Sequence, residues 1–185
     1  MYKNINQHQT YMRHFFVLCG VLLASLSGFS QEFQKVPLKK VIAEAQNDFD
    51  LFKGDLNATA EDDSFYSSTV TLEGSKNNEI SQLSGKLTQY HAYIADSASK
   101  KKAKALVEDW RLKIKAACID YYEEKVASTF QNRITNGYRF SKVIGKELYT
   151  ISIVYRKRES DAYHWVLLTV TRQGRAVLDD EGEPE

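Results

Sequence analysis

The fold is decided by residues 138–172, which read YRFSKVIGKELYTISIVYRKRESDAYHWVLLTVTR. Apolar and polar residues alternate over 148–156 and again over 163–172, and this period of two is typical of β-strands. Short polar connections separate these two stretches from each other and from a third, 138–144. Three successive strands with short connections predict an antiparallel meander.

A long helix is predicted before this meander. Apolar residues from Ala103 to Cys118 recur at helical spacing, and the pattern can be followed to about Val126. The residues just before it, among them Ser99, favour the N-terminal cap of a helix. Trp110 lies in the middle of the apolar stripe, so we expect it to be the central contact between the helix and the sheet.

The first half of the chain adds a shorter helix and two strands. Helical spacing predicts a helix over 37–53, and alternation predicts strands over 66–73 and 86–95. The polar stretch 55–64 is expected to be an exposed loop. The order α-β-β-α-β-β-β predicts an α+β, two-layer domain in which one antiparallel sheet of about five strands has two helices packed on one face.

Residues 1–30 have the pattern of a secretory signal peptide. They contain two basic residues and no acidic one, and their apolar run, 15–26, is 12 residues long. A membrane-spanning helix needs about 20 apolar residues. Small residues, Gly28 and Ser30, then occupy the −3 and −1 positions of a cleavage site after Ser30. The prediction is a secreted or periplasmic protein, and an uncleaved N-terminal anchor is the alternative.

Cleavage would leave one α+β domain over 31–175 and an acidic tail over 176–185 that we expect to be disordered. The net charge would change from +1 to −1, because residues 1–30 carry two positive charges and no negative one. Cys118 would be the one cysteine left, so no internal disulfide could form. An exported domain without a disulfide fits a bacterial envelope.

Composition excludes several classes of protein. The chain has 25 Lys and Arg residues against 24 Asp and Glu, which is not the basic balance of a nucleic-acid-binding domain. A hydrophobic fraction of 43% with 26% charged residues is typical of a globular domain. No nucleic acid is expected as a partner, and membrane contact is expected only through the signal peptide before cleavage. The oligomeric state stays open.

Catalytic and metal-binding motifs are missing from the sequence. There is no His-Glu-x-x-His or Cys-x-x-Cys pattern, and the glycines after residue 30 are isolated, so neither a metal nor a cofactor is assigned. Cys118 lies on the apolar stripe of the long helix, where burial should raise its pKa. His91 and His164 lie in predicted strands and are expected to face solvent. No catalytic residue is assigned.

The strand over 163–172 has large side chains on both faces, so one face can pack on the helices and the other can meet a partner. The predicted function is therefore an exported small binding domain of a bacterial envelope, with a protein or a glycan as its partner. The alternatives are a small secreted hydrolase that pairs a histidine with a carboxylate, and a periplasmic chaperone or inhibitor. The predicted binding surface comprises Tyr149, Tyr155, Arg156, Lys157, Arg158, Tyr163 and Trp165.

Overall fold

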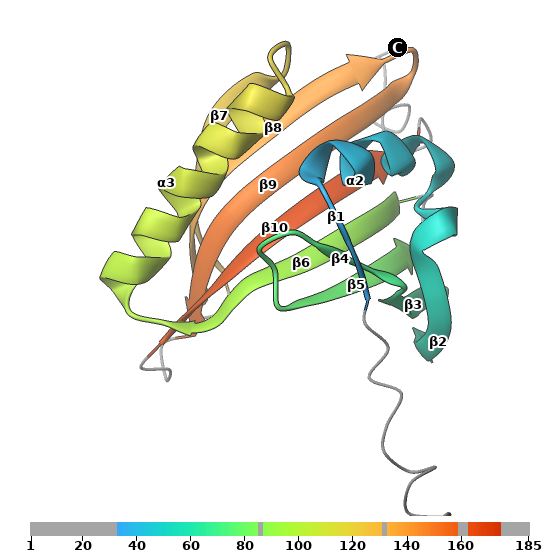
Figure 1. Cartoon of the computed structure of the whole chain (residues 1–185), viewed down its shortest axis with the longest axis horizontal. Coiled ribbons are helices and arrows are strands. Elements are labelled where there is room, and N and C mark those ends of the chain that lie inside the picture. Colours follow the sequence, from blue (N-terminus) through green and yellow to red (C-terminus); the bar gives the residue numbers. More distant parts are fainter. Residues whose placement is uncertain (1–32, 85–86, 131–132, 159–162, 175–185) are drawn as a thin grey trace, which may run out of the picture. The chain divides into compact units, whose positions relative to one another are not determined.

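The computed structural model describes residues 33–84, 87–130, 133–158 and 163–174. The predicted signal peptide, its cleavage site and the acidic tail lie outside the described residues. The main feature is an antiparallel sheet of eight strands in the order β2-β3-β5-β6-β10-β9-β8-β7 (Figure 1). These strands are β2 (Lys53–Ala60), β3 (Asp63–Ser68), β5 (Asn77–Leu83), β6 (Leu87–Ala98), β7 (Tyr122–Phe130), β8 (Arg133–Ile144), β9 (Glu147–Arg158) and β10 (His164–Gln173).

The predicted meander is confirmed as β8, β9 and β10, each pairing antiparallel with the next. Gly145 makes the tight turn between β8 and β9, where its φ of 64° suits a residue without a Cβ. In the register of β9 and β10, Val166, Leu168 and Val170 are opposite Tyr155, Ile153 and Ile151. This row is the apolar face that the alternation predicts.

One helix, α3 (Lys100–Ala117), carries the chain across the sheet. The chain leaves β6 in the middle of the sheet, crosses along α3 to the far edge at β7, and returns strand by strand until β10 pairs with β6 (Figure 1). Ser99 caps the helix by accepting a hydrogen bond from the Lys102 backbone amide. Trp110 is buried on the side of α3 that faces the sheet.

The predicted two-layer α+β domain with about five strands is wrong, because the domain is mostly antiparallel sheet and its main sheet has eight strands. The stretch 55–64 is not a loop but most of the β2–β3 hairpin. Every residue from Asp55 to Ala60 is exposed on this edge strand, so no apolar alternation marks it.

The long helix ends at Ala117, and residues that continue its apparent spacing, such as Tyr122 and Val126, belong to β7. Tyr122 and Val126 are four residues apart, and this spacing places two side chains on one face of a strand as well as on one face of a helix. Asn136 and Gly137, which resemble a hairpin turn, lie inside β8.

The first predicted helix is also shorter than expected. α2 covers Leu38–Glu44, and two 3₁₀ turns follow, at Ala45–Asn47 and Asp50–Phe52. Asp48 and Phe49 between them have positive φ angles, which end the helical path. Beside these turns, β1 (Gln34–Val36) and β4 (Val70–Leu72) form a small parallel sheet.

The hydrophobic core lies between one face of the main sheet and these covering elements. Phe49, Val36 and Leu72 are fully buried together with Tyr90 of β6, and Ile114 of α3 is buried in the same core. We call the opposite face of the sheet the open face, because both helices, β1 and β4 lie on the core side in the part of the chain that the structure describes (Figure 1). No helix among these residues has the length and apolar character to cross a membrane.

Candidate functional site

The structure does not bring the predicted binding residues together on one surface. Tyr149 and Tyr155 are on the core side of β9: Tyr149 is buried, and its hydroxyl donates a hydrogen bond to Glu147 at 2.6 Å. Burial, with Glu147 beside it, raises the pKa of Tyr149 to about 12. Arg156 and Trp165 are register partners on the open face, where Trp165 is 41% exposed.

The other predicted residues flank these two. Tyr163 precedes β10 and is exposed. Lys157 is half-buried and close enough to His164 for its charge to act on that ring. Arg158 is the last residue of β9 and the register partner of Arg133, but its side chain lies outside the described set. Of the seven predicted residues, therefore, Arg156 and Trp165 form the pair that the open face of the sheet brings together.

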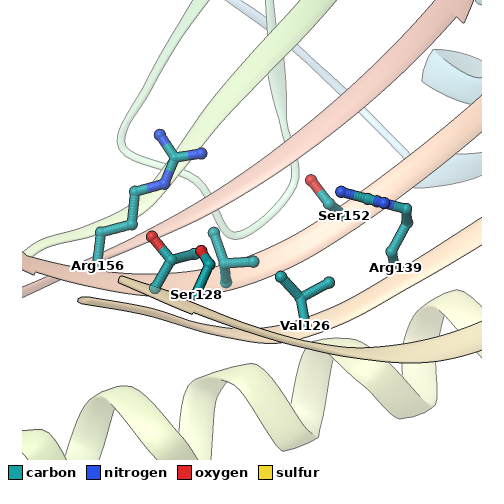
Figure 2. Close-up of a pocket in the computed structure, with 7 residues that line it drawn as sticks. Val126, Ser128, Arg139, Ser152 and Arg156 are labelled. Carbon is teal, nitrogen blue, oxygen red and sulfur yellow. The ribbon is translucent and has the colours of Figure 1, made fainter. Parts of the chain in front are cut away.

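A hollow of about 310 Å³ opens beside Arg156 on the open face. In the register of β7, β8 and β9, its lining residues surround Gly137, whose partners are Val126 and Val154. We call it the Gly137 hollow; Figure 2 shows five of its side chains rising from the strands on the side away from α3. Its lining consists of Val126, Ser128, Thr135, Arg139, Ser152, Val154 and Arg156.

Gly137 is at the centre of the lining residues in the register and has no side chain of its own. The backbone of β9 leaves no space here even for a methyl group. A Cβ on Gly137 would lie 2.0 Å from the Ile153 carbonyl oxygen and 2.7 Å from the Val154 Cα. A glycine inside a strand is typical of a close backbone approach.

The lining is amphipathic. Two guanidinium groups, of Arg139 and Arg156, stand at its ends, and Figure 2 shows Ser128 and Ser152 between them. Thr135 adds a third hydroxyl group and is the register partner of Arg156. Arg139 Nη1 donates a hydrogen bond to Glu124 at 3.0 Å, and both side chains remain partly exposed. The floor is apolar, since Val154 is 3% exposed.

A polar row runs from Ser152 of β9 through Thr169 of β10 to His91 of β6 and Glu79 of β5. His91 hydrogen-bonds through Nε2 to the Ser81 hydroxyl at 3.0 Å and through Nδ1 to the Thr169 hydroxyl at 3.3 Å. Burial lowers the pKa of His91, and the charge of Arg156 lowers it further, against an opposing effect of Glu79. The Arg156 charge therefore extends over this part of the open face.

The second histidine is on the core side. His164 is buried, where an outward position was expected, and its ring packs edge-on against Tyr155 with centroids 5.6 Å apart. Burial lowers the pKa of His164, with smaller contributions from Lys157 and Lys100. Its Nδ1 has no hydrogen-bond partner among the described residues.

The two histidines are thus on opposite faces of the sheet. Within the described residues, the hydrogen bonds of the His91 ring are made with the hydroxyl groups of Ser81 and Thr169. Ser81, which has the geometry of a nucleophile next to a base, is 2% exposed, so a substrate could not reach it.

Within the described ranges no three side chains of the metal-ligating types converge. Cys118 is buried with its pKa raised to about 11, mainly by that burial, which confirms the expectation for this thiol.

A second hollow, of about 320 Å³, lies between α3 and the strands. Tyr138, one of its residues, donates a hydrogen bond to Glu108 at 2.6 Å and packs under the Arg111 guanidinium at 4.5 Å. These contacts hold α3 against the sheet. We therefore assign this second hollow to the packing between the helix and the strands and not to a binding site. Its lining comprises Lys104, Val107, Glu108, Lys125, Asn136, Gly137, Tyr138 and Tyr155.

Most of the Gly137 hollow was not predicted, because Asn136-Gly137 is typical of a hairpin turn, the third strand was expected to begin at Tyr138, and the helical pattern was followed to about Val126. A signal for it exists: Thr135, Gly137, Arg139 and Ser141 alternate with Asn136, Tyr138 and Phe140 across that supposed turn. A strand that continues through the glycine places Thr135 on the same face as Arg139 and opposite Arg156.

Comparison of the chain with protein-family models, with curated proteins and with solved structures gives no match.

Proposed function

We propose that the protein is an exported, non-enzymatic binding domain of a bacterial envelope that holds an acidic glycan on its open face. The observation that carries the proposal is the Gly137 hollow, with a guanidinium group at each end and the exposed Trp165 beside Arg156. The signal-peptide pattern of residues 1–30 supports the export part of the proposal.

The positive charge and the lining residues of the Gly137 hollow favour an acidic glycan over a protein as the ligand. The centre of a protein–protein interface is normally depleted of charge and filled by aromatic or apolar anchors. Here the centre of the candidate surface is a small hollow with hydroxyl and guanidinium groups in its walls. Guanidinium groups bind carboxylates and sulfates in a planar, two-pronged geometry, and an exposed indole ring can cover the apolar face of a neighbouring unit.

Fluorescence titration of the full chain tests this proposal. Polygalacturonate and hyaluronate are the acidic ligands, and dextran is the neutral one. We expect saturable binding of the acidic polymers, weakening as salt is raised, and about tenfold weaker binding by W165A, the size of one aromatic contact. The control is L112A, which removes an exposed apolar residue from α3.

Equal binding of dextran, or unchanged binding by W165A, would contradict the proposal. Saturable binding of polyglutamate without binding of any polysaccharide would assign a protein ligand and would also overturn it. Thermal unfolding of W165A should match that of the unaltered chain; if W165A does not fold, W165Y replaces it.

A further inference from the structure

We propose that the Gly137 hollow is a subsite for one acidic sugar unit of the uronic acid class. The inference rests on the proposed function and specifies which unit of the glycan is recognised. A uronic acid presents three kinds of surface: a carboxylate, a ring of hydroxyl groups and patches of C–H. The lining of the hollow offers one partner for each kind.

The carboxylate would bind a guanidinium group at an end of the hollow. Arg139 and Thr135 are four residues apart on β8, and Thr135 is the register partner of Arg156, so the two arginines start from backbone positions about 13 Å apart along the strands. Figure 2 shows their side chains on the same side of the sheet, on either side of Ser128 and Ser152. The space between them is therefore long enough for a sugar ring, with an acidic group at one end or at both.

Arg139 can bind a carboxylate without losing Glu124. The guanidinium group has five N–H donors, and the bond to Glu124 uses a single nitrogen, Nη1. The side chains of Arg139 and Glu124 are about half exposed, so their ion pair is weak and is easily shared with a ligand.

The hydroxyl groups and the apolar floor of the hollow fit the other two kinds of surface on a uronic acid, its hydroxyl groups and its C–H patches. Ser128, Thr135 and Ser152 each have a hydroxyl that donates one hydrogen bond and accepts others, as sugar hydroxyls require. Val126 and Val154 are opposite each other across Gly137 and provide an apolar base for C–H groups. A bare oxyanion would use the arginines but would leave this base and most of the volume of about 310 Å³ unfilled.

Amide NMR titrations of the full chain test the inference with three probes: trigalacturonate, maltotriose and sodium sulfate. Trigalacturonate should bind best and should shift the amides of Gly137, Val154 and their neighbours. R139Q and R156Q should each weaken its binding about tenfold, which is the size of one charge-assisted hydrogen bond. K101Q, which removes an exposed positive charge on α3, should leave binding unchanged.

Filling the hollow gives an independent test that alters no charge. Ser128 lies on β7 and lines the hollow, whereas its neighbour Ala127 is exposed on the opposite face of the same strand. S128W should abolish trigalacturonate binding, and A127W should preserve it, although both place an indole on the same edge strand.

Four results would overturn the inference. Sulfate binding as tightly as trigalacturonate would make the hollow a plain oxyanion site. Unchanged trigalacturonate binding by S128W would place the sugar elsewhere. Amide shifts far from Gly137, with acidic polysaccharides still bound and W165A still weakened, would remove this subsite while leaving the proposed function intact; loss of all polysaccharide binding would remove both.

Discussion

Gly137 lies in the middle of β8, where the backbone of β9 approaches too closely for a side chain. We expect G137A to lower the free energy of unfolding by more than about 2 kcal/mol, because the new methyl group can be placed only by moving the two strands apart. Chemical denaturation followed by circular dichroism measures the change.

The matched control is Gly145, the turn residue between β8 and β9. Its φ of 64° is unfavourable for alanine, which is not a feature of Gly137, but no atom lies within 4 Å of a Cβ built at Gly145. G145A should therefore cost about 1 kcal/mol, the conformational penalty alone. Equal losses of unfolding free energy for G137A and G145A would contradict the prediction, because they would show that the β9 backbone does not exclude a methyl group at Gly137.

At the scale of elements, Arg172 at the end of β10 joins three parts of the chain. Its guanidinium donates hydrogen bonds to Asp48 at 2.5 Å, in the turn after α2, and to both carboxylate oxygens of Glu147 at the start of β9. The hydrogen bond from Arg172, with a second from Tyr149, lowers the pKa of Glu147 to about 2. The network ties the short N-terminal elements to the meander.

The Glu147 carboxylate stabilises the fold only while it is ionised. Its pKa is lower in the folded chain than the ordinary value of 4.5, so its contribution is complete above about pH 4.5 and is lost as the pH falls toward 2. We expect E147Q to lower the free energy of unfolding at pH 7 by about 1 to 3 kcal/mol and to remove this part of the acid dependence.

Urea unfolding of E147Q and the unaltered chain between pH 2 and 7 measures that difference. The ion pair of Lys113 and Asp109 on α3 is the comparison, since both of its side chains are more than half exposed. K113Q should change stability by less than about 0.5 kcal/mol. A pH profile of E147Q that parallels that of the unaltered chain would contradict the role given to Glu147.

At the scale of the whole described domain, the two faces of the sheet differ in what covers them. The chain has two tryptophans, one for each face: Trp110 is 4% exposed under α3, and Trp165 is 41% exposed on the open face. The covered face provides the core, and the open face provides the candidate site.

Fluorescence quenching reports on the two faces separately. Acrylamide should quench W110F, which retains Trp165, several-fold more strongly than W165F, which retains Trp110, because a quencher must contact the ring. If W110F is too unstable to measure, the quenching lost between the unaltered chain and W165F gives the contribution of Trp165. Weak quenching of Trp165 would show that something covers the open face.

How far the sequence predicts the fold depends on how much of each element is buried. The strand over 148–156 and the first part of the long helix were predicted because each buries a regular face: Ile151 and Ile153 every second residue, and Ala103, Val107 and Ile114 at helical spacing. β2 and β7 were missed because edge strands bury little and leave no such pattern.

The candidate site was predicted only in part for a similar reason. Arg156 and Trp165 lie on well-patterned strands, so their shared face can be inferred from alternation. Arg139 and the serines of the hollow belong to β7, β8 and β9, and their meeting depends on strand order and register.

The sequence by itself determined the meander with its apolar face and the burial of Cys118 and Trp110, since each follows from local periodicity; export through residues 1–30 stays a prediction. The tertiary structure alone decided the eight-strand order, the burial of His164 and the ring of side chains around Gly137. These depend on pairing between distant segments, and a turn-like dipeptide such as Asn136-Gly137 becomes part of a strand when its neighbours on both sides supply the hydrogen bonds.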